Sequence, residues 1–472
     1  MSTPIASFLT DANFKSVLYI ISFGLFIYGL SGLTGPKTAV RGNRIAAVGM
    51  AVAVIATLLV DDFNNAALIV IGCVVGTAIG VPAARNVKMT QMPQMVALFN
   101  GVGGGAVALI AWAEFRETDG FAFEPTYIAI FSVFSAIVGS ISFWGSNVAF
   151  AKLQELIHGR PITLGALQLP AQILMLGAAI AAGVAICADP QEEIVMVGLL
   201  VAAAIFGLLL VLPIGGADMP VVISLLNAFT GLAAAAAGVS LDNQALIVAG
   251  MIVGASGTIL TQQMAVAMNR TITSVIAGGF GGEVTAAVGA GDGEQGTVRS
   301  TSAADVAIQM AYASQVVVVP GYGMAVSQAQ HAVREMAKLL ESKGVTVKYA
   351  IHPVAGRMPG HMNVLLAEAD VPYDQLKEMD DINGEFSRTD VSLVIGANDV
   401  TNPDARTKPE SPIYGMPILN VDESSSIIVL KRSMSSGYAG IDNPLFFNPK
   451  TSMLFGDAKG SVESVTEELK AL

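Results

Sequence analysis

The chain has 472 residues, of which 53% are hydrophobic and only 13% are charged. Soluble domains carry about 25% charged residues, so an ordinary soluble protein is excluded. The formal net charge of −12 argues against a nucleic-acid partner. Both cysteines, Cys73 and Cys187, lie in apolar stretches, which argues against a disulfide framework and a cysteine-based metal site. We therefore expect no metal.

Residues 1–266 predict a multi-pass α-helical membrane domain. A spanning helix needs about 20 mostly apolar residues. Nine segments meet this requirement: 16–34, 45–60, 66–84, 92–113, 127–150, 163–187, 193–212, 219–239 and 243–266. The second is short, and the eighth begins at a glycine-rich stretch broken by Pro220. A soluble bundle would require many adjacent apolar helices without polar faces, which disfavours that alternative.

The charges in the loops predict how these spans are oriented. Basic residues follow the first, third, fifth and ninth spans: Lys37, Arg41, Arg44, Arg85, Lys88, Lys152, Arg160 and Arg270. Acidic residues occupy the loops after the second, fourth and sixth spans, whereas the seventh loop, Pro213–Pro220, has no basic residue. Because basic loops favour the cytoplasmic side, we expect the N-terminus outside and the C-terminal domain in the cytoplasm.

A few polar residues lie within or beside the spans, where they are costly unless paired or hydrated. They are Asn100 in the fourth span, Ser146 in the fifth, Asn227 in the eighth and Asp218 just before the eighth. No histidine lies inside a span, so a histidine proton relay is absent from these segments. Each polar residue alone is consistent with an interhelical hydrogen bond. Two asparagines beside glycine-rich surfaces can instead border a water-filled path.

The remaining sequence predicts a linker and an α/β domain. Repeated glycines in residues 267–302 indicate a flexible linker. From residue 303 to 472, strands and helices alternate, which predicts a Rossmann-like, doubly wound parallel sheet. The expected helices are Ser302–Ala313 and Met324–Ser342, and the expected strands are Val316–Pro320, Val345–Ala350, Val391–Gly396 and Ile427–Leu430.

A glycine motif follows the first strand of this domain. Gly321 and Gly323 lie between the strand and its helix, the position of a dinucleotide fingerprint, although Val326 replaces the third glycine. The second strand lacks the acidic residue that would bind a 2′-hydroxyl, which favours NADP over NAD. A plain strand–turn–helix is the alternative. A potassium selectivity filter is disfavoured because the following helix is charged.

Two cations and a hydroxyl follow a late strand of the same domain. They belong to the run Lys431-Arg432-Ser433. Guanidinium, ammonium and hydroxyl groups suit the recognition of a 2′-phosphate.

At this point the chain closely resembles the beta subunits of proton-translocating NAD(P) transhydrogenases of the Re/Si-specific type. The resemblance spans nearly the whole chain and rests on long motifs. They are Pro320–Val326, His352–Ala369, Ile395–Asp399, Lys431–Met434, Gly437–Gly440, Asn443–Phe447, Leu454–Ala458, Gly215–Pro220 and Ser274–Gly281.

The resemblance implies an enzyme that transfers hydride from NADH to NADP⁺ while protons move inward across a bacterial inner membrane. This chain would bind NADP(H), an alpha subunit would bind NAD(H), and the assembly would be a dimer of protomers in the lipid bilayer. The implied NADP(H) contacts are Gly321, Tyr322, Gly323, Met324, Ala325, Val326, His352, Val354, Ala355, Gly356, Arg357, Met358, Pro359, Gly360, Gly396, Asn398, Asp399, Lys431, Arg432, Ser433, Gly437, Tyr438 and Ala439.

The resemblance also implies roles for particular residues. The glycine loop would approach the pyrophosphate, residues 352–360 would lie near the nicotinamide, and Tyr438 would belong to a loop that closes over the nucleotide. Asp399 would couple protonation to nucleotide binding. Many family members have a membrane histidine where this chain has Asn100. We therefore expect the titrating group of the proton path to lie largely outside this chain, with Asn100, Ser146 and Asn227 lining the path and Asp218 near its cytoplasmic mouth.

Two other functions are compatible with a membrane domain joined to a nucleotide fold. The first is a nucleotide-gated transporter or channel with a redox-sensing Rossmann domain. The second is a binding protein whose membrane part is only an anchor, and nine spans are excessive for that purpose. Neither alternative accounts for the long motifs of the resemblance.

Overall fold

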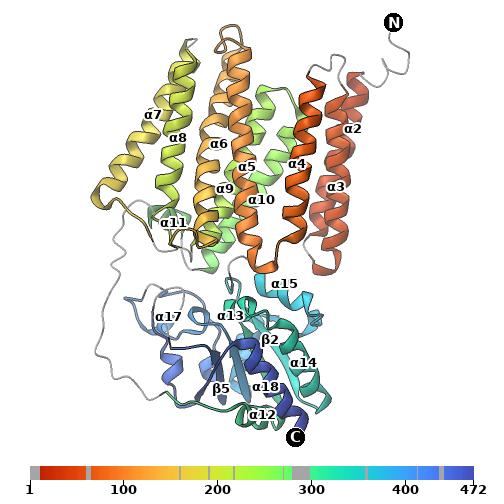
Figure 1. The fold of residues 1–472 in the computed structure, drawn as a ribbon, viewed down its shortest axis with the longest axis vertical. Coiled ribbons are helices and arrows are strands. Elements are labelled where there is room, and N and C mark those ends of the chain that lie inside the picture. The colour runs from red at the N-terminus through yellow and green to blue at the C-terminus, as the bar shows by residue number, and fades with distance from the viewer. Residues whose placement is uncertain are drawn as a thin grey trace.

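The computed structural model describes residues 11–33, 35–59, 65–158, 161–189, 192–215, 218–268, 271–278, 298–356, 360–411, 413–434 and 441–472. Within these ranges, nine helices are long and apolar enough to cross a membrane, and six strands form one sheet. Figure 1 shows the nine helices side by side in one half of the molecule and the sheet domain at one end of them. The predicted fold class is confirmed.

The nine helices match the nine predicted spans. They are α2 (Ala12–Gly32), α3 (Pro36–Leu58), α4 (Ala66–Asn86), α5 (Met92–Glu117), α6 (Thr126–Leu153), α7 (Gln168–Ala188), α8 (Glu193–Val211), α9 (Met219–Ser240) and α10 (Gln244–Ala267). The largest difference is at α3, which begins at Pro36 rather than near residue 45. Its first turns are polar and contain Arg41 and Arg44, so the apolar pattern alone misses its beginning. A proline at N1 favours that helix start.

Small residues let the central helices approach closely. A Cβ atom added to Gly104 of α5 would lie 2.9 Å from the carbonyl oxygen of Gly139 on α6, closer than real side chains come. Gly231 of α9 and Gly254 of α10 meet in the same way, because a Cβ on Gly231 would lie 2.7 Å from the Gly254 nitrogen. Close backbone approach is the main source of helix association in lipid. Glycines therefore pack α5 closely against α6, and α9 against α10.

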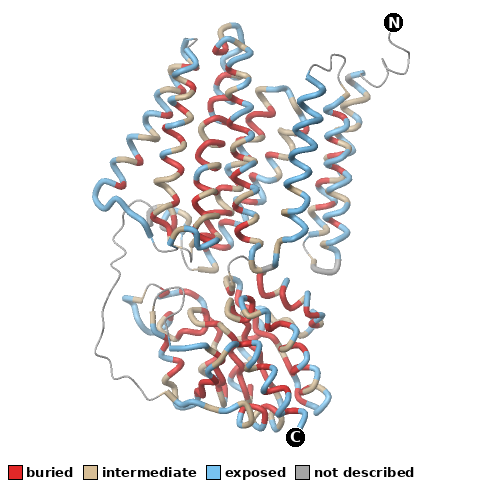
Figure 2. The backbone as a smooth tube through the Cα atoms, viewed as in Figure 1, coloured by how far each residue is buried: buried red, intermediate tan, exposed pale blue. Residues whose placement is uncertain are grey.

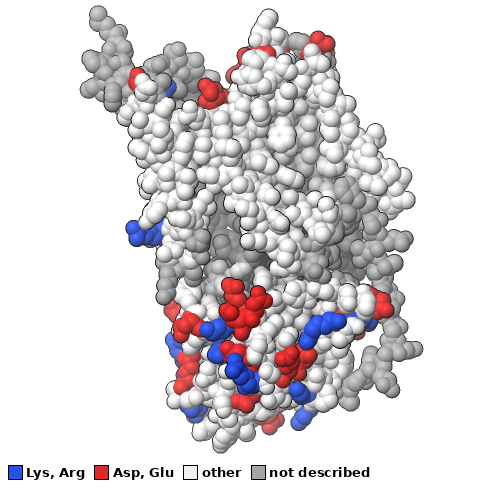
Figure 3. Space-filling view, turned by 180° about the vertical axis from the view of Figure 1, so that it is seen from behind, with Lys and Arg blue, Asp and Glu red and all other residues white. Residues whose placement is uncertain are grey.

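Burial differs strongly between the helices. In α6, α8 and α9, at least half of the most apolar 18-residue segment is buried. In α4, no part of the corresponding segment is buried. Figure 2 shows the contrast between the buried central helices and the exposed α4. Figure 3 shows charged side chains gathered on the sheet domain and at the far end of the helices, with an almost uncharged belt between. This belt is what a lipid-embedded surface requires.

The sheet has the strand order β3-β2-β1-β4-β5-β6, and every neighbouring pair is parallel. The strands are β1 (Gln315–Pro320), β2 (Thr346–Ile351), β3 (Leu376–Glu378), β4 (Val391–Ile395), β5 (Ser426–Lys431) and β6 (Thr451–Phe455). Side chains alternate along β1, so that Val316 and Val318 join one core and Val317 and Val319 join the other. A strand buried on both faces explains the unbroken apolar run.

Helices cover both faces of the sheet. One face packs against α12 (Ala303–Ala311), α14 (Gln330–Ser342), α15 (His361–Glu368) and α18 (Ala458–Ala471). The other face is covered by short helical turns that carry Ile382, Phe386 and Val421. Ser302 caps α12 by accepting from the Asp305 backbone N–H at 3.2 Å, which confirms the predicted start of that helix. Before it, the Met453 N–H donates to the Arg299 carbonyl, so residues 299–301 run along β6.

The sequence predicted one continuous helix over Met324–Ser342, and this prediction was wrong. The chain forms a single turn, α13 (Tyr322–Val326), then breaks, and α14 begins at Gln330. Gln328 has a φ of 52°, a left-handed conformation that a continuous helix does not allow. The short strands β3 and β6 were not predicted. The predicted linker contains one described helix, α11 (Ile272–Gly278), and residues 279–297 lie outside the described residues.

A buried lysine ties together the helix ends that face the sheet domain. Lys152, near the end of α6, donates from Nζ to the carbonyl of Leu212 and, at 2.8 Å, to that of Ile214. Gln94 of α5 donates to the Leu153 carbonyl at 3.2 Å. These bonds join the ends of α5, α6 and α8 with the turn that leads into α9. They satisfy carbonyls at a helix end that lack a partner within the helix.

We predict that Lys152→Met lowers the stability of the chain by about 1–3 kcal/mol, because the buried Ile214 carbonyl loses its donor and the Leu212 carbonyl keeps only the Ile162 N–H. Thermal unfolding in detergent measures the effect. Lys152→Arg, which keeps the donors, should retain most of the stability. Lys88→Met, at an exposed lysine, is the matched control. A Lys152→Met protein that is as stable as the Lys88→Met protein would contradict this account.

Candidate functional site

The strand order creates a crevice at the carboxyl edge of the sheet. From β1 the chain proceeds outward through β2 and β3, whereas β4, β5 and β6 lie on the other side of β1. In folds of this kind, ligands bind in a crevice at this point of the sheet edge, where the strand order reverses. Figure 1 shows that α13 and α15, which follow β1 and β2, lie on the side of the domain nearest the membrane helices. The crevice thus faces the helical half.

Glycines hold the two central loops in direct backbone contact. The Gly321 N–H donates to the Ile395 carbonyl at 2.9 Å, and the Gly323 N–H donates to the Gly396 carbonyl at 3.0 Å. A Cβ on Gly323 would lie 2.7 Å from the Gly396 Cα, and Gly396 has a φ of 63°. Side chains are excluded at both positions. Tyr322, Met324, Ala325 and Val326 form the turn that follows Gly321.

His352 follows β2 and is held as a neutral ring. It is 1% exposed. The Val354 N–H donates to Nδ1 at 3.2 Å, so the ring proton lies on Nε2, which donates to the Pro417 carbonyl at 2.8 Å. Burial lowers the pKa of His352, against the opposing effect of the Pro417 carbonyl. His352 therefore fixes the loop after β2 to the segment around Pro417.

The rest of this loop is described only in part. Ala355 is buried, and Gly356 and Gly360 have φ values of 105° and 67°. The predicted contacts Arg357, Met358 and Pro359 lie outside the described residues. Sequence reasoning did not single out His361, whose ring centroid lies 6.4 Å from that of Tyr322. This contact links the loops after β1 and β2.

Amide side chains connect the loop after β4 with the segment before β6. Asn443 donates to the Asn398 carbonyl at 3.0 Å, and Asn398 donates from its amide to Asp399 Oδ1 at 3.1 Å. Asn402 donates to the Asp442 carbonyl, also at 3.0 Å. The predicted residues Asn398 and Asp399 thus lie beside the end of β5. Asn402 and Asn443 were missed as positioning residues because their partners are distant in the sequence.

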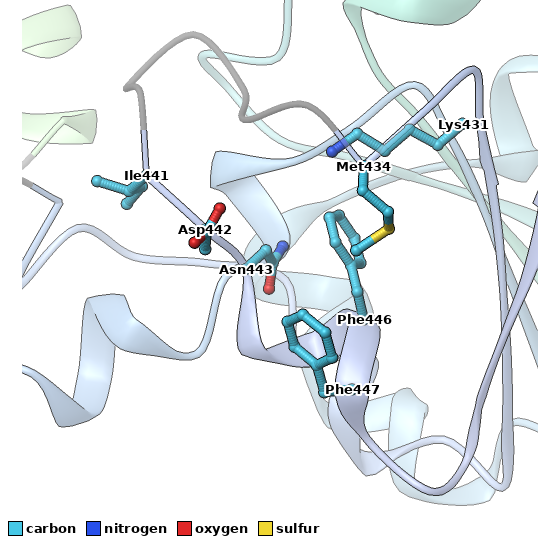
Figure 4. Close-up of a pocket in the computed structure, with 7 residues that line it drawn as sticks. All are labelled: Lys431, Met434, Ile441, Asp442, Asn443, Phe446 and Phe447. Atoms are coloured by element: carbon cyan, nitrogen blue, oxygen red, sulfur yellow. The ribbon is translucent and has the colours of Figure 1, made fainter. Parts of the chain in front are cut away.

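Lys431 ends β5 and lines a small pocket. The other lining residues are Met434, Ile441, Asp442, Asn443, Phe446 and Phe447. Figure 4 shows the Lys431 side chain crossing the pocket toward the segment with Asp442 and Asn443. Its Nζ lies 4.6 Å from the centroid of the Phe446 ring. Partial burial lowers the pKa of Lys431, and the carboxylates of Asp399 and Asp442 oppose that effect.

Arg432 and Ser433 follow Lys431 and are exposed at the same edge. Gly437, Tyr438 and Ala439 lie outside the described residues. Among the residues that the structure describes, no group of three or more His, Cys, Asp or Glu could hold a metal ion.

In the helical half, a polar network joins three helices. Asn100 of α5 donates from Nδ2 to Ser146 Oγ at 2.9 Å and to Ser142 Oγ at 3.2 Å, both on α6. Ser142 in turn shares a 2.5 Å hydrogen bond with Thr230 of α9. Asn100 is 7% exposed, and in the described part of the chain its Oδ1 has no hydrogen-bond partner. A donor is therefore missing at one buried oxygen.

The structure unites some of the predicted membrane residues and not others. Asn100 and Ser146 are in contact, whereas Asn227 is half-buried one turn before Thr230 and Asp218 lies at the beginning of α9. Ser142 and Thr230 were missed. The signal that could have found Ser142 is its spacing of four residues from Ser146, which places both on one helix face.

Comparisons with known proteins agree with the motifs. The family model described as NAD(P) transhydrogenase beta subunit matches residues 15–468. A curated relative from Rhodospirillum rubrum, named NAD(P) transhydrogenase subunit beta, is 48% identical over 460 residues. The match covers 96% of this chain and 98% of the relative. A protein with the same name from a defined strain of that species matches to the same extent.

The burial of His352 predicts a pH dependence of stability. Its folded pKa lies below the unfolded value of about 6.5, so the unfolded chain binds more protons just below that pH. The stabilising contribution is complete above pH ~6.5 and declines as the pH falls toward the folded pKa. Thermal unfolding in detergent between pH ~7.5 and ~5.5 should show a steeper loss for the wild type than for His352→Asn. His331→Asn, at an exposed histidine, should behave as the wild type. Equal slopes for all three proteins would refute this role.

Proposed function

The chain belongs to the NAD(P) transhydrogenase beta subunit family, and from this premise we propose that it binds NADP(H) in its sheet domain and conducts protons through its helices. In this function, hydride passes from NADH on an alpha subunit to NADP⁺ on this chain, and protons move inward. The observation that carries the proposal is the meeting of a glycine-only backbone contact and a cationic pocket at one sheet edge.

The residues at this edge suit NADP(H). Gly323 and Gly396 bring the loops after β1 and β4 into direct backbone contact, which any side chain there would prevent, and glycines after the first strand let a pyrophosphate approach the backbone closely. Lys431 and Arg432 supply the charge that a 2′-phosphate needs. No carboxylate directly follows β2, where Ile351 precedes His352, so a 2′-phosphate would not be repelled there. The nicotinamide supplies the hydride chemistry when bound, and the protein supplies position.

The His352–Pro417 contact supports the placement of the nicotinamide end. It holds the loop after β2 against the segment around Pro417 while adding no charge, because the ring is neutral. Hydride transfer between two nicotinamides needs alignment rather than acid or base assistance. Residues 352–356 and 360 would supply one wall of that position. The partner's nucleotide would approach from the open side of the crevice.

Two observations support a membrane partner. The helix α4 has no described residue that is buried, although every other predicted span packs against a neighbour. Asn100 Oδ1 is buried without a donor in the described part of the chain. Membrane helices of an alpha subunit would cover exposed surface and could bring a titrating group to the polar network. A dimer of such protomers would complete the assembly.

The arrangement of the chain supports the proposed orientation. Figure 1 shows α2 beginning at the end of the helical half that is far from the sheet domain. An odd number of spans places the N-terminus and the sheet domain on opposite sides of the membrane. Basic residues such as Arg85 lie near the ends that face the sheet domain. By the charge rule for loops, that side is the cytoplasm of a bacterial cell.

We propose that protonation in the membrane switches the sheet domain between an open and an occluded NADP(H) state. Coupling of this kind is reciprocal, so NADP(H) must also change proton affinity in the membrane. A charge that crosses ~100 mV gains about 2.3 kcal/mol, which is enough to displace a nucleotide equilibrium more than about tenfold. Inward proton flow would therefore drive NADPH synthesis.

The first prediction from this function concerns activity. Sealed inverted vesicles that contain this chain and its alpha partner should reduce NADP⁺ with NADH at a rate that rises with the proton gradient. An uncoupler should lower that rate. Absorbance of the reduced nucleotide, with a thionicotinamide analogue of NADP⁺ to separate the signals, measures the reaction. Activity that ignores the gradient would refute coupling, and transport of another solute would favour the transporter alternative.

The second prediction concerns the polar network. Asn100→Ala should lower gradient-driven activity by about tenfold or more, because the α5–α6 hydrogen bonds and the buried oxygen are lost. NADP⁺ binding to the sheet domain should be unchanged. Asn147→Ala is the matched control, since Asn147 donates only to the Phe143 carbonyl of its own helix. Intact pumping in Asn100→Ala vesicles would show that Asn100 serves packing alone.

A further inference from the structure

A carboxylate shares the proposed phosphate pocket with its cation. Lys431 and Asp442 line the same small pocket, and Figure 4 shows them on facing sides of it. The ammonium of Lys431 lies over the Phe446 ring, which leaves its charge directed into the pocket. Asp442 is close enough to stabilise the charged form of that ammonium. A phosphate that paired with Lys431 would therefore enter the field of a negative group.

The backbone that carries Asp442 is fixed. Its carbonyl accepts from the Asn402 amide at 3.0 Å. The next residue, Asn443, is 1% exposed, donates to the Asn398 carbonyl at 3.0 Å and accepts from the Leu445 N–H at 2.9 Å. The main chain at Asp442 cannot withdraw without breaking these bonds. The backbone therefore keeps Asp442 on the wall of the pocket, while its side chain is exposed.

Asp399 is the other carboxylate that acts on Lys431, and it differs from Asp442. Its Oδ1 accepts a hydrogen bond from the Asn398 amide at 3.1 Å, which holds it on the loop after β4. Asp442 instead lies on the pocket wall itself. Of the two, Asp442 is the group that a phosphate in the pocket would meet.

We propose that Asp442 sets the affinity of this chain for the 2′-phosphate of NADP(H), holding Lys431 while the nucleotide is absent and repelling the phosphate when it binds. The proposal rests on the proposed function and deepens it. Removal of the charge would strengthen NADP(H) binding and slow its release. Asp442 thus weakens the ground-state complex in favour of exchange of the nucleotide. It determines selectivity through repulsion as well as attraction.

The test is nucleotide binding to the full chain in detergent micelles, measured by calorimetry. Asp442→Asn should lower the Kd for NADP⁺ by about five- to tenfold, and the Kd for NAD⁺ should not change. Asp442→Ser, a second neutral variant, should behave in the same way if the asparagine variant folds poorly. Asp442→Glu keeps the charge and should stay within about twofold of the wild type. Glu463→Gln, an equal charge change at an exposed site on α18, is the control.

Salt provides an independent readout. At ~1 M ionic strength the screening length falls to about 3 Å. The difference in Kd for NADP⁺ between Asp442→Asn and the wild type should therefore shrink, whereas a difference caused by altered packing would persist. An unchanged or raised Kd for NADP⁺ in the neutral variants would overturn the proposal, as would an equal gain for NAD⁺. A wild-type chain with no preference for NADP⁺ over NAD⁺ would instead remove the nucleotide assignment itself, and the role of Asp442 with it.

Discussion

The pairing of β1 with β4 is the constraint on which the proposed nucleotide site depends. It places two loops that are distant in the sequence at one edge, where Gly321, Gly323 and Gly396 touch through their backbones. Because no side chain fits between these loops, their backbones stay in direct contact at that edge. The loops after β2 and β5 then add a neutral histidine on one side and Lys431 on the other. The chemistry of the site is thus arranged by strand order.

The helical half obeys a different constraint, which is that lipid cannot satisfy a polar group. Several polar side chains in its interior accordingly have specific partners: Asn100 with Ser146, Ser142 with Thr230, and Lys152 with two carbonyls. Among the described residues, the buried side-chain oxygens of Asn100 and Gln94 have no hydrogen-bond donor. Together with the exposed α4, these oxygens are sites where packing within the described part of the chain is incomplete.

Much of this could be predicted because the strongest signals are local. Apolar runs of about 20 residues define the spans, and the run Val316–Val319 identifies a strand buried on both faces. Other features depend on tertiary contacts. The helix after β1 breaks at Gln328, and β3 has only three residues, too few for a periodic pattern. The partners of Asn402 and Asn443 lie about 40 residues away. The hydrogen bonds that fix the segment beside Lys431 could therefore not be predicted from the spacing of residues in the sequence.

Coupling between the two halves must pass through the helix ends that face the crevice. There, Lys152 and Gln94 join the ends of α5, α6 and α8 through hydrogen bonds. These ends must therefore move together when the hydrogen bonding at Asn100 changes. In the sheet domain, the fixed backbone at Asp442 keeps a negative charge beside the positive charge of Lys431 in the proposed phosphate pocket. A site that holds both charges needs only a small displacement to favour binding or release. In the proposed function, a modest difference in affinity between the two states is one that the energy of a proton crossing the membrane, about 2.3 kcal/mol per ~100 mV, can reverse.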